Sequence, residues 1–189
     1  MKRALLISYT EQSANSLSEL LKAEGYRDII ISNTANAARR LVEDDEYDLI
    51  CINAPLHEEN GIELSEYFAR TTRSSVVIIV PQKNADDVND LLTKHGVLVI
   101  AKPINKHLFH HFLQFTDCFR TRMLCVEQEN EKLRHLVEDM KIINRAKLLL
   151  ISCLNMNETQ AHRYLEKQAM DLRVSKLHVA KQVIRTYEN

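Results

Sequence analysis

The sequence predicts a doubly wound α/β domain, then a long coiled-coil helix and a small all-α bundle of three helices. Three observations support this prediction. Over residues 1–112, short and nearly continuous apolar runs alternate with helical patterns. Over residues 113–144, apolar residues recur at alternating spacings of three and four. Over residues 135–189, three helical patterns are separated by residues that favour helix ends.

Five apolar runs predict the strands of a parallel sheet. They do not alternate with polar residues, as expected for strands that are buried on both faces. Helical patterns separate the runs, with Gly25 placed to close the first helix and Thr34 placed to cap the second. The predicted strands cover residues 4–7, 29–31, 49–52, 76–80 and 97–100.

Ligands of doubly wound sheets bind beyond the carboxyl ends of the strands. Those ends carry Ser8 with Tyr9, Asn53, Val80 with Pro81, and Lys102 with Pro103. The arrangement resembles the receiver domain of bacterial response regulators, which has a flavodoxin/CheY-like fold. The resemblance implies two acidic residues for Mg²⁺ after the first strand, a phosphate-accepting Asp after the third, a Ser/Thr after the fourth and a Lys after the fifth. Only Lys102 with Pro103 matches.

These replacements predict a pseudo-receiver that is controlled without phosphorylation. The amide of Asn53 is a poor nucleophile and cannot form an acyl phosphate. Ser8 and Tyr9 supply no carboxylate for a hard dication. We expect Lys102 to remain as a structural relic that hydrogen-bonds the Asn53 side chain. The alternative is phosphorylation at Asp48 or Glu58 in a rearranged site.

An apolar ladder follows the predicted α/β domain and indicates a parallel dimeric coiled coil. Asn130 occupies a core a position, where paired asparagines fix the register of two strands. The alternative is one long amphipathic helix that packs on its own domain. The ladder consists of Thr116, Phe119, Met123, Val126, Asn130, Leu133, Val137, Met140 and Asn144.

The charges beside the ladder favour the dimer. With Thr116 as position a, each g residue of a parallel dimer faces the e residue five positions further along the partner. Arg122 then faces Glu127, and Glu129 faces Arg134, so both pairs are attractive. A lone helix gives no reason for this match.

The last part of the chain resembles the ANTAR domain, the output module of the AmiR/NasR family of transcription antitermination regulators. Asn157, with Gln160 three residues later, forms a capping-box pattern before the second helix, and Ser175 can cap the third. The matching segments are Arg145-Ala146-Lys147 before an apolar run, Asn157-Glu158-x-x-Ala161, Leu165-x-x-x-Ala169-Met170, and Val179-Ala180-x-x-Val183-Ile184. Two departures stand out, because Leu148 replaces a usual Gly and Glu166 lies in a usually basic stretch.

The resemblance implies that a dimer binds paired stem-loops in a nascent leader transcript. Stabilising that structure prevents a terminator hairpin from forming, so polymerase reads through. Phosphates require Lys or Arg, and unpaired bases require stacking and edge contacts. The basic candidates for RNA contacts are Arg145, Lys147, Arg163, Lys167, Lys176, Lys181 and Arg185.

The charge distribution agrees with a polyanion partner for the second half. The formal net charge is −1, but residues 1–118 carry 12 Lys/Arg against 17 Asp/Glu, and residues 119–189 carry 13 against 9. Without a phosphoryl signal, we expect control by a partner, such as a regulatory sensor protein. Two alternatives stay open: a protein-interaction adaptor without RNA activity, and a DNA-binding regulator.

Other features predict a cytoplasmic regulator that is not an enzyme. No segment has the length and apolarity of a membrane span, and no signal peptide is visible. The four cysteines lack C-x-x-C spacing, which favours reduced thiols. No nucleotide-binding loop or catalytic triad pattern is found. His107, His110 and His111 have helical spacing, but we expect solvated or dimer-facing side chains and neither a metal nor a cofactor.

Overall fold

The computed structural model describes residues 2–57 and 59–188 of the chain. They group into two compact units, with the boundary between Arg122 and Met123. Glu58, considered above as an alternative phosphorylation site, lies outside the described residues.

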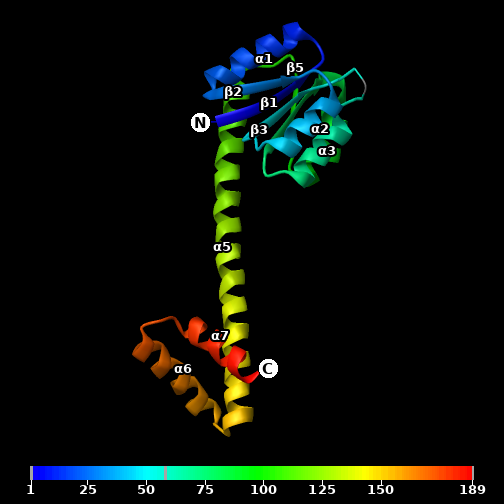
Figure 1. Cartoon of the computed structure of the whole chain (residues 1–189). Coiled ribbons are helices and arrows are strands. Elements are labelled where there is room, and N and C mark those ends of the chain that lie inside the picture. The colour runs from blue at the N-terminus through cyan, green and yellow to red at the C-terminus, as the bar shows by residue number, and fades with distance from the viewer. Residues whose placement is uncertain (1, 58, 189) are drawn as a thin grey trace. The chain divides into compact units, whose positions relative to one another are not determined.

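The first unit is built on a five-stranded parallel sheet with the order β2-β1-β3-β4-β5 (Figure 1). Every predicted apolar run forms a strand, so the doubly wound α/β fold is confirmed. The strand order reverses between β1 and β3, which is the point where such sheets bind their ligands. The strands are β1 Lys2–Ser8, β2 Tyr26–Ser32, β3 Leu49–Asn53, β4 Ser75–Pro81 and β5 Leu98–Lys102.

Helices cover both faces of this sheet and give it two apolar cores. One core lies beneath α1 and the beginning of α5, where Phe109 and Leu113 are buried. The other lies beneath α2, α3 and α4, with Leu64 and Phe68 at its centre. The helices are α1 Glu11–Ala23, α2 Ala35–Asp44, α3 Ile62–Thr71, α4 Ala85–Leu92 and α5 Lys106–Leu154, with 3-10 turns at Gln82–Asn84 and Thr93–His95.

Local signals place the first helices as the sequence predicted. The hydroxyl of Thr34 accepts a hydrogen bond from the backbone N–H of Ala37 and caps α2. Gly25 has a φ of 88°, and its N–H donates to the carbonyl of Lys22 at the end of α1. That left-handed conformation is inexpensive only for glycine, so the chain can turn sharply into β2.

The second unit contains the later turns of α5 with α6 (Glu158–Leu172) and α7 (Lys176–Tyr187). Asn157 and Gln160 form the predicted capping box, and Ser175 caps α7 through the N–H of His178. Small residues let the three helices approach closely. The core consists of Ala146, Leu150, Ala161, Leu165, Val179, Ala180 and Val183. The predicted three-helix bundle is therefore present.

Candidate functional site

The first candidate site is the carboxyl edge of the sheet, where β1 and β3 end side by side. The strand register places Ser8 opposite Asn53, and both side chains are buried. The amide nitrogen of Asn53 donates to the Ser8 hydroxyl at 2.9 Å. The Asn53 amide and the Ser8 hydroxyl thus form a hydrogen bond within this buried edge.

Lys102 does not bond to Asn53 as the sequence analysis expected. Its Nζ donates instead to the backbone carbonyl of Ala54, at 2.6 Å. The Ala54 carbonyl lies within hydrogen-bond distance of Nζ at the same edge, while the Asn53 amide nitrogen donates to Ser8. Burial lowers the pKa of Lys102 from its ordinary value.

The exposed side of this edge is aromatic. The ring of Tyr9 lies 4.8 Å from that of His57 between centroids, and Tyr9 is about half exposed. The strand ends supply a hydroxyl, a phenol, an amide and an ammonium group, none of which is a carboxylate. Mg²⁺ binds through several hard oxygen ligands, usually with at least one carboxylate. The residues that end these strands therefore do not fit the metal of a working receiver.

Asp48 lies at the opposite edge of the sheet, directly before β3 begins. Its carboxylate accepts from the backbone N–H of Arg3 at 2.8 Å and forms an ion pair with Arg120 at 2.7 Å. The whole length of β3 separates Asp48 from the ligand-binding edge at Asn53. Asp48 is thus a structural anion that fixes the start of β3.

The histidines at the start of α5 form a small surface cluster. The Nε2 atoms of His107 and His111 are 3.2 Å apart, and His110 contacts the Glu24 carboxylate at 2.6 Å. Within residues 2–57 and 59–188, no group of three or more His, Cys, Asp or Glu side chains could hold a metal ion. In the same ranges, no helix has the length and apolarity needed to cross a bilayer.

The ladder on α5 is exposed along its apolar side chains. Six of its members are between 46% and 62% exposed, which is high for large apolar residues. Among the described residues, none of the six belongs to an apolar core cluster of its own unit. The exposed members are Phe119, Met123, Val126, Leu133, Val137 and Met140.

Three of the basic candidates in the bundle form ion pairs with acidic residues of the same unit. Arg145 pairs with Glu188, and Lys147, whose side chain is only 16% exposed, lies 3.4 Å from Glu158. Lys176 donates to Glu166 at 2.8 Å. This hydrogen bond, reinforced by the charge of His162, lowers the pKa of the Glu166 carboxyl.

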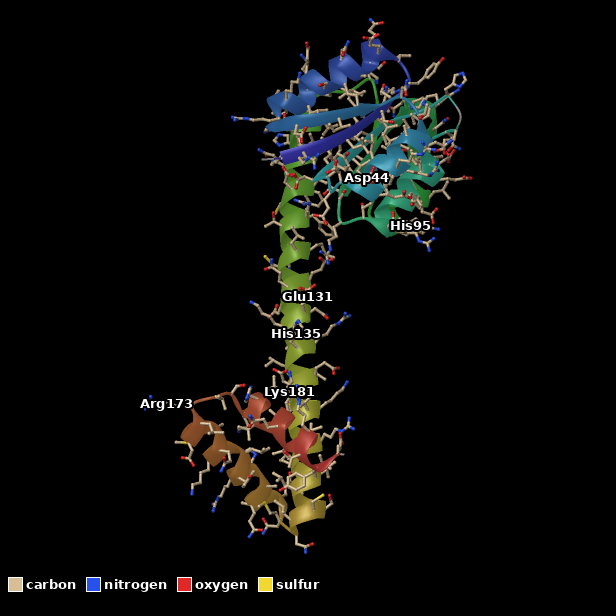
Figure 2. The ribbon with its side chains drawn as sticks, viewed as in Figure 1. Asp44, His95, Glu131, His135, Arg173 and Lys181 are labelled. Carbon is tan, nitrogen blue, oxygen red and sulfur yellow. The ribbon has the colours of Figure 1, made fainter. Side chains whose placement is uncertain are left out.

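The other basic candidates point to solvent. Arg163 and Lys167 are four residues apart on α6 and lie opposite its buried Ala161 and Leu165. Lys181 (labelled in Figure 2) and Arg185 are related in the same way on α7. Over the part of the chain that the structure describes, these four cations form no ion pair. The α6 pair and the α7 pair are therefore available to an anion.

Arg173 is an exposed cation that the sequence analysis did not single out. It lies in the turn between α6 and α7 (Figure 2) and has a φ of 54°, in the left-handed region. Its N–H donates to Met170, while that of Val174 donates to Ala169. Glycine or asparagine usually fills this helix-ending position. The segment between the two predicted helices contains neither glycine nor asparagine, and this could have indicated that Arg173 takes the helix-ending position.

Comparison with known proteins divides the chain in the same way. Residues 5–114 match the response regulator receiver domain, and residues 131–184 match the ANTAR domain. Solved receiver structures share the fold of the first part. The signal receiver domain of a putative Luxo repressor protein from Vibrio parahaemolyticus has a TM-score of 0.59 at 22% identity, over 67% of this chain and 97% of that one. A CheY-like receiver from Methanospirillum hungatei has 0.58 at 18%, over 65% and 98%.

Two curated relatives extend the likeness beyond the sheet. The transcriptional regulatory protein PdtaR of Mycobacterium tuberculosis is 24% identical over 170 residues, which cover 90% of this chain and 83% of the relative. The aliphatic amidase regulator of Pseudomonas aeruginosa is 26% identical over 116 residues, which cover 61% and 59%. The first alignment spans both compact units.

Proposed function

Because this chain belongs to the response regulators that join a receiver domain to an ANTAR domain, we propose that it is a transcription antitermination regulator that binds RNA as a homodimer. The relatives are a transcriptional regulatory protein and an amidase regulator, which supports a role in transcription. The observation that carries the RNA proposal is a set of solvent-facing cations on α6 and α7 of the ANTAR bundle that have no ion-pair partner among the described residues.

The α6 pair is the primary RNA contact in this proposal. A helix that presents Arg163 and Lys167 on consecutive turns can follow a phosphate backbone or bracket a loop. The guanidinium of Arg163 can also stack on an unpaired base. Lys181 and Arg185 add a second pair on α7, and Arg173 stands in the turn that joins the two helices.

Arg145, Lys147 and Lys176 take a secondary role. Each must exchange a carboxylate of its own unit for an RNA phosphate, so the net gain of each contact is smaller. Among these carboxylates, Glu166 has two basic neighbours, since it accepts a hydrogen bond from Lys176 and lies 3.1 Å from His162. In the proposal, Glu166 lowers RNA affinity because its carboxylate competes with RNA phosphates for Lys176.

Replacing Glu166 with glutamine should therefore tighten RNA binding. The substitution Glu166→Gln releases Lys176 for a phosphate and should strengthen binding several-fold while steepening the salt dependence by about one ion. Filter binding across a salt series measures both quantities. Glu138→Gln makes the same charge change at an exposed ion pair on α5 and is the control. Equal effects of the two variants would show that only net charge matters.

Dimerisation through the α5 ladder completes the proposal. The exposed apolar stripe and the matched charges beside it support a parallel two-stranded coil. Two bundles joined in this way can engage two stem-loops at once, which raises affinity without any new contact within either bundle. A monomer lacks this gain.

In this proposal the receiver acts as a protein-binding domain rather than a phosphoryl switch. Asn53 is already hydrogen-bonded to Ser8, and Lys102 to Ala54. A regulatory sensor protein, rather than a phosphate, then decides when the RNA-binding half acts. The half-exposed Tyr9 and His57 lie at the edge that such a partner would contact.

Incubation with Mg²⁺ and a small phosphodonor should leave the chain unmodified. Intact-mass spectrometry is expected to show no acid-labile gain in mass, because no residue at the strand ends supplies both an acyl acceptor and a metal ligand. Asn53→Asp should also stay unmodified, because Ser8 and Tyr9 still provide no carboxylate. A working receiver treated alongside verifies the donor. Acid-labile phosphate on the natural chain would refute phosphorylation-independent control.

Gel shifts with the leader RNA of the protein's own operon test the function. Binding to RNA with paired stem-loops should weaken steeply with salt and exceed binding to duplex DNA of the same sequence. Preference for the duplex would favour a DNA-binding regulator. The complete absence of salt-sensitive binding would leave a protein-interaction adaptor as the better description.

A further inference from the structure

Leu148 is the most exposed apolar side chain of α5 within the bundle. It is 66% exposed, although it follows the buried Ala146 by only two positions. The bundle core is formed by Leu150 and its neighbours and does not include Leu148. An exposed leucine that continues an apolar stripe is a candidate contact for another molecule.

The α5 ladder runs directly toward Leu148. On a helix with about 3.6 residues per turn, Leu148 lies one turn beyond Asn144 and two beyond Met140. Ile151 follows on the same side and is only partly covered by the bundle. The ladder therefore does not stop at Asn144 but continues along the first helix of the bundle.

The strict heptad would place Lys147, not Leu148, in the seam. Lys147 is instead turned into its own bundle, where it contacts Glu158. Leu148 follows Lys147 directly and occupies the e position, which flanks the seam of a parallel dimer.

The g positions of the coil become apolar toward the bundle. Arg122 and Glu129 are charged, and Leu136 is the first apolar g residue. In the last heptad the g residue is Ile143, and the position that it faces on a parallel partner is that of Leu148. An apolar pair thus replaces the ion pairs where the coil enters the bundle.

We propose that Leu148 is a dimer contact that holds the two RNA-binding bundles against each other, with a second copy of this chain as its partner. The inference rests on the dimer of the proposed function and adds that the interface extends into the bundle. The two bundles then have a fixed mutual arrangement, which sets the spacing of the two stem-loops that one dimer can bind.

Replacing Leu148 with alanine tests the energetic part of this inference. Sedimentation equilibrium of the full chain should show a dimer Kd raised by roughly ten- to a hundredfold, since apolar burial is lost in both subunits. The fold should survive because the side chain is exposed within its own chain. Met170→Ala is the control and should leave the dimer Kd unchanged. Met170 lies on α6, is similar in size to leucine and is 78% exposed.

Pyrene labelling tests the geometry. Leu148→Cys, with Cys118, Cys125 and Cys153 changed to serine, should give excimer emission when labelled. Cys51 is fully buried, and burial raises the pKa of its thiol to about 12, so it should not react. As a control, the natural Cys153 is labelled instead, because it lies about 140° around the helix from Leu148. It should give no excimer.

The outcomes separate this inference from the proposal beneath it. A monomeric natural chain would refute the dimer itself. A natural dimer with neither an excimer at position 148 nor an effect of Leu148→Ala would refute only the extended interface. Weaker RNA binding by Leu148→Ala with an unchanged dimer Kd would also overturn it, since Leu148 would then contact RNA.

Discussion

Replacing Met123 and Leu133 together with lysine should convert the dimer into a monomer. Met123 is an a residue and Leu133 a d residue of the ladder, and both are about half exposed in the single chain. In the dimer they would face their own copies, so each substitution removes apolar burial and opposes two like charges. We expect the dimer Kd to rise by roughly a thousandfold or more.

The same variant should lose most of its RNA affinity while keeping its fold. Each unit should stay folded, because neither side chain belongs to a core, although circular dichroism should show some loss of helix from the unpaired part of α5. RNA affinity should fall roughly a hundredfold, since two linked bundles become two independent ones. Gln128→Lys with His135→Lys is the control and should stay dimeric, because both positions are exposed and lie away from the ladder. Figure 2 labels His135. A fully dimeric Met123→Lys, Leu133→Lys protein would show that the ladder is not the interface.

Reversing the charge of the α6 pair should abolish RNA binding without affecting the dimer. Arg163→Glu with Lys167→Glu removes two phosphate contacts from each subunit and places carboxylates beside the RNA. A loss of roughly a hundred- to a thousandfold follows at moderate salt. Both side chains point away from Ala161 and Leu165, so the bundle core is unchanged.

Lys83→Glu with Lys94→Glu provides the control for that variant. These exposed lysines belong to the receiver, and their reversal makes the same change in net charge. RNA affinity should fall only slightly. If both double variants weaken binding equally, RNA responds to net charge rather than to the α6 surface. If the α6 variant binds normally, the contacts lie elsewhere on the bundle.

The elements of this fold could be predicted from sequence because their signals are local. Continuous apolar runs specify buried parallel strands, and Thr34, Asn157 and Ser175 each cap a helix through a backbone N–H three residues away. The apolar ladder likewise needs only the spacing of residues along one helix. In each case, neighbours in sequence are also neighbours in space.

The contacts at the sites were harder to predict because they join distant residues. Arg145 reaches Glu188 across 43 positions, and Lys102 reaches Ala54 across 48. Whether Lys102 bonds to the Asn53 side chain or to the Ala54 carbonyl depends on the path of the chain after β3, which local sequence does not specify. The sequence likewise did not indicate that Lys147 turns toward its own bundle and leaves Leu148 exposed. These two residues are neighbours on the helix, and which of them is exposed depends on how the bundle packs.

The distribution of ion pairs also refines which cations matter. By motif alone, Arg145 and Lys147 are the strongest RNA candidates, yet both have carboxylate partners in the bundle. Arg163 and Lys167 match no motif as closely, but they have no carboxylate partner among the described residues. We therefore propose the outer face of α6 as the main RNA surface, with the motif residues in support.

Single-round transcription in vitro tests the central claim most directly. The template carries the operon leader with its paired stem-loops and terminator, and the reactions contain the unphosphorylated protein and no phosphodonor. The account predicts that added protein raises read-through, and that the Met123→Lys, Leu133→Lys variant does not. Unchanged read-through at protein concentrations that saturate the leader RNA would contradict it, as would read-through that requires a phosphodonor.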